Sequence, residues 1–229
     1  MIDHVTPVRE RDPGIRGKDL KASSSTFATT IYQDLKDSIL TAKLRPNQRI
    51  TQREIAQLFN VSLTPVREAL QRLAAEGYVV MTARSEVKVV ELDRADYAKL
   101  IELVRLVETG AMHRAIREIP ESKIEELRCL QDGLKEQYER DDLGAYLAQS
   151  DAIHDFIWKL YDNPFVYEVL TDAVAKIKMI AANYYSYYTP KILQRSFEQH
   201  TKLFEAIERR DFRLASRVLD QHWSPDFFR

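Results

Sequence analysis

The chain has 229 residues, of which 45% are hydrophobic and 30% are charged, and its formal net charge is −1 at pH 7. This composition excludes a disordered protein, and no apolar run reaches the 18 or so residues that a membrane-spanning helix needs. The single cysteine, Cys129, cannot form an internal disulfide, and the polar N-terminus has no apolar signal segment, so we expect a cytoplasmic protein.

Glycine is scarce, with 6 residues, and helix-forming residues are plentiful, so the fold class is expected to be mainly α.

Residues 1–26 mix charge, proline, glycine and serine without apolar periodicity, which is typical of a flexible N-terminal arm. Residues 1–92 carry a net charge of +3 and the remainder −4. This direction of charge favours an anionic partner for the front half.

Helical periodicity begins at residue 27. Ile31, Leu35 and Ile39 fall on one face and predict a first helix that runs to about residue 43. Thr51 followed by Glu54 has the spacing of a capping box, which predicts a second helix ending near Asn60.

A third helix is expected to begin with Thr64 as its cap and Pro65 at the first helical position, where the missing N–H costs nothing, and to end at Gly77. Two β-rich segments, 78–81 and 87–91, follow as a predicted hairpin. This order of elements predicts a winged helix-turn-helix over residues 27–92, a unit whose third helix enters the DNA major groove.

Arg67 lies one turn into the third helix, on the side away from Val66 and Leu70. A guanidinium at this place can offer a bidentate pair of donors to a guanine edge. The alternative is a surface arginine that pairs with Glu68 or Gln71.

The string VSLTPVREAL, followed by QRLAAEG, resembles the DNA-binding domain of GntR-type transcription regulators. The resemblance implies that Arg53 and Arg67 contact DNA and that the hydroxyls of Ser62 and Thr64 bind phosphate. Arg84, in the turn of the wing, is a further expected contact. Two departures stand out, because relatives have arginine where this chain has Leu63, and the wing turn lacks the usual glycine.

Residues 93–229 have helical periodicity throughout and predict an all-α bundle that binds an effector and dimerises. The candidate helices cover 93–118, 121–140, 142–162, 165–188, 190–209 and 211–223. Pro120, Pro164 and Pro190 separate them, and Asp211 is a candidate cap for the last.

His154, His200 and His222 fall in three of these helices, and imidazoles from separate helices of a bundle can converge as metal ligands do. The alternative for each is a hydrogen-bonded histidine in the core or on the surface.

The C-terminal half resembles the FCD ligand-binding domain of FadR-type GntR regulators, through VRLVETGAMHRAI, IHDFIWKLYDNPFV and EQHTKLFEAIERRDFRLASRVLDQHW. The resemblance implies a divalent metal, of the zinc, nickel or manganese type, held by the three histidines and by an aspartate four residues before the first. That position is Ser150 here, and Asp151, on the same helical face as His154, is the candidate replacement. The alternatives are water or the effector as the fourth ligand, or a weak or empty site.

The resemblance also implies a small organic acid as effector. Arg105 is the main candidate to bind it, with Asn183 and Tyr184 as further candidates. The alternative for Arg105 is a local pair with Glu102, Glu108 or Thr109 at the surface.

Together these features predict a homodimeric DNA-binding transcription regulator that is not an enzyme. Its partners are operator DNA and a carboxylate metabolite, without a membrane. Repression relieved by the effector is the expected logic, although activation is compatible with the same residues. The alternatives are a metal-dependent enzyme that uses His154, His200 and His222, and a DNA-binding dimer that has lost its effector site.

Overall fold

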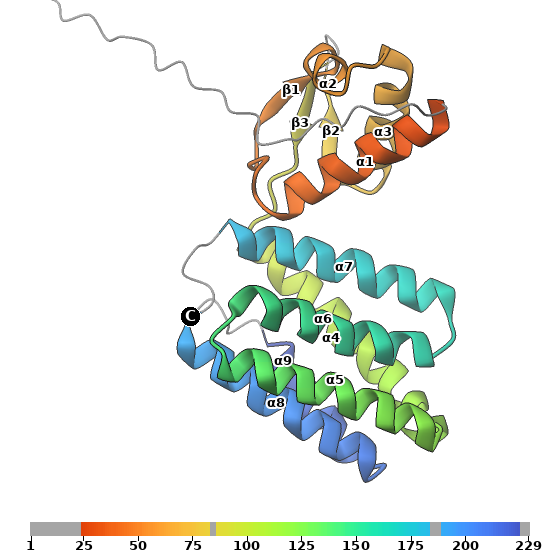
Figure 1. The fold of residues 1–229 in the computed structure, drawn as a ribbon, viewed down its shortest axis with the longest axis vertical. Coiled ribbons are helices and arrows are strands. Elements are labelled where there is room, and N and C mark those ends of the chain that lie inside the picture. The colour runs from red at the N-terminus through yellow and green to blue at the C-terminus, as the bar shows by residue number, and fades with distance from the viewer. Residues whose placement is uncertain (1–23, 83–85, 184–188, 225–229) are drawn as a thin grey trace, which may run out of the picture. The chain divides into compact units, whose positions relative to one another are not determined.

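The computed structural model describes residues 24–82, 86–183 and 189–224 (Figure 1). The chain divides into two compact units, Met1–Glu91 and Leu92–Arg229. Among the described residues, no helix is both long and apolar enough to cross a membrane.

The first unit packs three helices against a small antiparallel sheet. Its elements are α1 (Ser24–Leu40), β1 (Arg49–Thr51), α2 (Gln52–Phe59), α3 (Leu63–Ala75), β2 (Val79–Met81) and β3 (Glu86–Val89). The strand order is β1-β3-β2, with β3 antiparallel to both neighbours. This is the predicted winged helix-turn-helix, with α3 as its third helix. Helix α1 includes residues 24–26 of the expected arm, and residues 1–23 lie outside the described residues.

The start of α2 is the predicted capping box. The Thr51 hydroxyl accepts a hydrogen bond from the Glu54 N–H at 3.1 Å, and the Glu54 carboxylate accepts the Thr51 N–H at 2.8 Å. Asn60, with a left-handed φ of 51°, ends the helix as expected. These reciprocal bonds fix the backbone at the first residue of α2, which is Gln52.

The predicted start of α3 was wrong by two residues. The cap is Ser62 and not Thr64, and Pro65 is the third residue of the helix and not the first. The first four N–H groups of a helix have no acceptor within it, so a proline at the third position still loses no hydrogen bond. Pro65 is buried and Thr64 is exposed.

Strand β1 was not predicted. It is three residues long, and its register pairs Arg49 with Lys88 and Thr51 with Glu86. Such a short strand carries no periodicity of its own and is defined by its pairing with β3.

The second unit contains the six predicted helices. They are α4 (Arg94–Glu118), α5 (Glu121–Glu139), α6 (Leu143–Leu160), α7 (Pro164–Ala182), α8 (Pro190–Glu208) and α9 (Phe212–His222). Five of these helices begin and end within two residues of the predicted bounds. The exception is α7, which ends at Ala182 and not at 188, and residues 184–188 lie outside the described residues.

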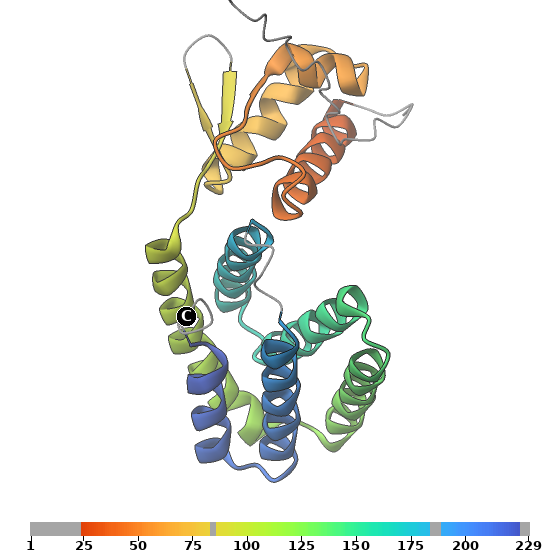
Figure 2. The same cartoon turned by 90° about the vertical axis from the view of Figure 1, so that its left-hand side faces the viewer.

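Helix pairs α4–α7, α5–α6 and α8–α9 pack closely, and α9 also packs on α4 (Figure 2). The shared core is built of aliphatic side chains with Tyr97, Tyr146, Trp158 and Trp223. This arrangement turns the inner faces of α4, α6, α8 and α9 toward one another.

Candidate functional site

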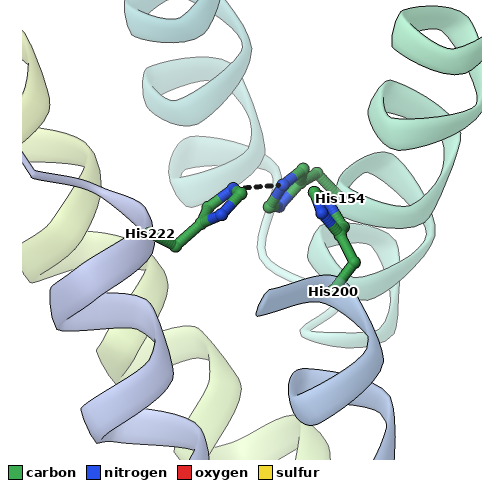
Figure 3. Close-up of side chains that lie close together, drawn as sticks. All are labelled: His154, His200 and His222. Carbon is green, nitrogen blue, oxygen red and sulfur yellow. Dashed lines mark hydrogen bonds between the residues drawn. The ribbon is translucent and has the colours of Figure 1, made fainter. Parts of the chain in front are cut away.

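Three histidines from three helices converge inside the second unit (Figure 3). His154 comes from α6, His200 from α8 and His222 from the end of α9. Their ring centroids lie 4.8 to 5.2 Å apart, and one nitrogen of each ring falls within 4.8 Å of the others. The histidines predicted from the sequence are therefore brought together.

The hydrogen bonds of His154 and His200 define which ring nitrogen carries the proton. His154 Nδ1 lies 2.8 Å from the Glu108 carboxylate, and His200 Nδ1 lies 2.8 Å from the Ser196 carbonyl oxygen. Both oxygens can only accept, so each Nδ1 is the donor. The Nε2 atom of each ring is then the nitrogen with a free lone pair, and His200 Nε2 lies 3.1 Å from the Ser150 hydroxyl.

His222 has the same arrangement, because its Nδ1 lies 3.2 Å from Gln199 Oε1. Its Nε2 is 3.2 Å from the Nε2 of His154. Two facing lone pairs repel each other, and a proton or a metal ion between the rings would remove this repulsion. Ligand nitrogens bound to one tetrahedral zinc are about 3.4 Å apart, which follows from a Zn–N distance of about 2.05 Å. The residues therefore fit a divalent metal.

Burial keeps two of the imidazoles neutral. It lowers the pKa of His200 to about 3, and the electrostatic interaction with His154 acts in the same direction. Burial also lowers the pKa of His222 well below 6.5, because a charge on this ring would be unfavourable so close to the other two imidazoles. Both rings are neutral at pH 7, which is the form of histidine that binds metal ions.

Glu108 of α4 forms the outer layer of this centre. Its fully buried carboxylate accepts hydrogen bonds from His154 Nδ1, from Trp158 Nε1 at 2.8 Å and from Trp223 Nε1. Burial alone raises the pKa of Glu108, but the charge on His154 and these three hydrogen bonds outweigh it, so the net pKa is lowered. An ionised carboxylate behind a ligand histidine fixes the orientation of its ring.

The sequence reading missed this role of Glu108 and considered the residue only as a surface partner of Arg105. The available signal was its spacing. Glu108 lies four residues after Val104 and four before Met112, and both of these are fully buried. An acid in register with an apolar helical face is a candidate for a buried, paired carboxylate.

The depressed histidine pKa values predict that the metal-free protein loses stability on acidification from pH 6.5 to 5. In this range the unfolded chain binds protons at His200 and His222, whereas the folded chain does not, so unfolding is favoured as the pH falls. Each histidine should contribute a slope that approaches about 1.4 kcal/mol per pH unit at the acidic end of this range. Urea unfolding of the metal-stripped protein at several pH values measures this slope. A free energy of unfolding that stays constant from pH 6.5 to 5 would contradict it.

The carboxylate of Asp151 forms an ion pair with Lys178 of α7, and Asp151 is not among the residues whose ligand atoms converge. Ser150 instead faces the cluster, with its hydroxyl 3.1 Å from His200 Nε2. Helical geometry explains the difference between Asp151 and Ser150. Viewed along the helix axis, residues three and four positions before His154 project to opposite sides of the His154 side chain.

The three candidate effector contacts are not joined to the histidines by any hydrogen bond among the described residues. Arg105 lies 4.0 Å from Asp220 of α9. Asn183 caps the end of α7, and its amide donates to the Met179 carbonyl oxygen at 2.7 Å. Tyr184 lies outside the described residues.

The candidate DNA contacts lie on α2 and the first turns of α3. Arg53, Ser62, Thr64 and Arg67 are exposed, Leu63 is partly buried, and Arg84 lies outside the described residues. Arg67 forms neither of the local pairs considered from the sequence. Its Nε donates instead to Gln52 Oε1 at 3.2 Å.

Comparisons with known proteins agree with this two-unit organisation. Residues 27–89 match the family model described as bacterial regulatory proteins, gntR family, and residues 99–224 match the FCD domain. The chain is 23% identical to the HTH-type transcriptional repressor RspR of Escherichia coli (strain K12), covering 84% of this chain and 83% of that protein. It is 30% identical to an uncharacterized HTH-type transcriptional regulator from an unstable DNA locus of Streptomyces ambofaciens, covering 88% and 84%.

Two solved structures share the fold. McbR/YncC of E. coli superposes with a TM-score of 0.73 at 20% identity, covering 86% of this chain and 93% of that one. A GntR-type transcriptional regulator from Rhodococcus sp. RHA1, described as putative, gives 0.72 at 18% identity, covering 89% and 96%.

Proposed function

Since this chain belongs to the GntR family of bacterial regulatory proteins and carries an FCD domain, we propose that it is a homodimeric repressor whose operator affinity is set by a metal-bound organic acid. The family membership makes it a DNA-binding HTH-type transcription regulator, and its relatives are regulators and not enzymes. The relative RspR is named a repressor, which supports the proposed sign of regulation.

The proposed DNA contacts are made by the exposed face of α2 and α3. Arg67 reads a base edge in the major groove, Ser62 and Thr64 bind phosphate, and Arg53 and Arg84 add basic contacts. Leu63 lacks the charge of the arginine found in relatives, so we expect a smaller dependence of binding on salt than an arginine would give.

The observation that carries the effector proposal is the convergence of three imidazoles, each with its Nδ1 hydrogen-bonded to another residue. His154, His200 and His222 would hold a divalent metal through their Nε2 atoms. Three nitrogen donors favour zinc or nickel over manganese, which prefers oxygen. The bound metal would act as a Lewis acid toward an anionic ligand. Asp151 could join the ligands only by giving up its ion pair with Lys178.

The chemistry of this donor set supports a carboxylate as the effector. The three imidazoles are neutral ligands, and Ser150 adds no charge where relatives have aspartate. The ionised Glu108 behind His154 offsets one charge of a divalent metal, so the centre would keep a net positive charge and attract an acid. On α4, the hydroxyl oxygen of Thr109 is buried without a hydrogen-bond partner among the described residues, one turn from Arg105. We propose that Arg105 and Thr109 lie beside the effector, with Asn183 and Tyr184 as further contacts.

The regulatory mechanism follows from two-fold symmetry. Two winged units of a dimer would read the half-sites of an imperfect palindrome. An effector that binds one arrangement of the dimer more tightly shifts the population toward it and changes operator affinity by the difference in its binding free energies.

Selection from random duplex DNA with the full-length protein tests this proposal. We expect a motif with two-fold symmetry bound by two chains, and release of that DNA by a carboxylate metabolite only when zinc or nickel is present. A panel of acids matched in size with neutral and cationic metabolites identifies the class. A motif without a repeat, bound by one chain, would contradict the dimer. Release by neutral or cationic compounds alone would contradict the carboxylate assignment.

A further inference from the structure

A side-chain hydrogen bond joins the two helices of the helix-turn-helix. Gln52 is the first residue of α2, and its Oε1 accepts the Nε–H of Arg67 on α3 at 3.2 Å. The two side chains differ in exposure, because Gln52 is only 5% exposed whereas Arg67 is exposed. A fixed acceptor therefore holds a side chain that otherwise extends into solvent.

The position of this acceptor is fixed through both the backbone and the side chain of Gln52. The capping box of Thr51 and Glu54 determines the backbone immediately before and after Gln52, and burial restricts the rotamers of its side chain. A long arginine side chain, by contrast, loses up to about 2 kcal/mol of rotamer entropy when a complex immobilises it. A tether that is present before DNA arrives removes part of this loss.

The position of the tether on the guanidinium determines how Arg67 can meet a base. A guanidinium has five N–H donors, one on Nε and two on each terminal nitrogen. A bidentate contact with guanine O6 and N7 needs two parallel donors from one edge. With Nε engaged by Gln52, the edge that contains Nε is occupied, and the terminal Nη1–Nη2 edge remains for the base.

We propose that Gln52 is a positioning residue that makes Arg67 read guanine end-on, through its two terminal nitrogens. Gln52 does not touch DNA in this arrangement and acts through Arg67. The inference rests on the base-reading role proposed for Arg67 and adds the residue that sets its orientation. Base preference at one position of each half-site then depends on a hydrogen-bond acceptor at residue 52.

Three variants of the full-length protein test this inference. Gln52→Met keeps the size of the side chain and removes the acceptor, Gln52→Glu keeps an acceptor, and Gln57→Met makes the same change at an exposed position of α2. Each is used in selection from random DNA and in titrations of the selected operator and its single-base variants. Circular dichroism confirms that each variant is folded.

For Gln52→Met we expect a 3- to 10-fold loss of affinity for the selected operator, from the lost ordering of one side chain. The guanine preference should weaken at one position per half-site and remain at the others. Gln52→Glu should keep that preference, and Gln57→Met should match the unchanged protein. A purely structural role would instead lower affinity for all sequences alike.

Two outcomes separate this inference from the function on which it rests. If Arg67→Ala removes the guanine preference while Gln52→Met keeps it, the base-reading role stands and the role of Gln52 is overturned. If Arg67→Ala itself leaves every base preference intact, the reading role fails, and the inference about Gln52 fails with it.

Discussion

Replacing Arg67 with alanine is expected to abolish specific operator binding while leaving the dimer mass and the helix content unchanged. A bidentate arginine–guanine pair contributes about 1–3 kcal/mol of discrimination, which corresponds to a loss of roughly 5- to 150-fold for each half-site. A dimer loses this interaction twice. Gel retention of the selected operator and of a scrambled duplex measures the effect, and the two duplexes should be bound almost equally by the variant.

Arg72→Ala is the matched control, because it removes the same charge from the last turn of the same helix. The Arg72 guanidinium lies over the ring of Tyr32 on α1, with its central carbon 4.0 Å from the ring centroid. We expect this variant to retain preference for the operator. Unchanged operator retention by Arg67→Ala would refute the assignment of α3 as the reading helix.

The second large effect is expected at the three histidines. Protein purified without an affinity tag should carry up to about one zinc or nickel ion per chain, and His154→Ala and His200→Ala should carry almost none, because two remaining imidazoles hold a metal far more weakly than three. Elemental analysis measures the content. His113→Ala is the matched control, since His113 is exposed and packs on Phe212 outside the cluster.

The Ser150→Asp variant should hold the metal more tightly than the unchanged protein. The Ser150 hydroxyl lies 3.1 Å from His200 Nε2, so a carboxylate at this position would add a charged oxygen ligand beside the nitrogens. We expect metal affinity to rise at least about tenfold, and the preference for an organic acid to weaken as the charge of the site falls. Equal metal content in all of these proteins would remove the metal site.

The parts of the fold that could be predicted from the sequence are those specified by local chemistry. Asn163 and Asp211 cap α7 and α9 with side-chain oxygens, as their places before Pro164 and Phe212 indicate. Strand β1 could not be predicted, because its three residues become a strand only by pairing with β3, which follows more than 30 residues later. The start of α3 was misplaced because both Ser62 and Thr64 are good capping residues, and Pro65 is tolerated anywhere in the first turn.

The candidate site could be predicted from the sequence only in part. Histidines in three separate helices can be recognised by residue type and spacing, and the structure brings their rings together. The spacing of Glu108 indicates a buried acid, but its partners could not be predicted, because they include indole groups contributed by α6 and by the residue after α9. Asp151 shares a helical face with His154, but residues on one face can still point in different directions. The Asp151 carboxylate points toward α7, where it forms an ion pair with Lys178.

The network around Glu108 has a practical consequence for observing this protein. The chain contains two tryptophans, Trp158 and Trp223, and both donate to the Glu108 carboxylate beside the histidines. Their ring centroids lie 5.8 and 5.4 Å from that of His154. All indole fluorescence therefore originates at the candidate metal centre, and none comes from the winged unit. When only tryptophan is excited, the fluorescence of this protein therefore reports whether the centre is occupied. No added label is needed, even when the protein is bound to DNA.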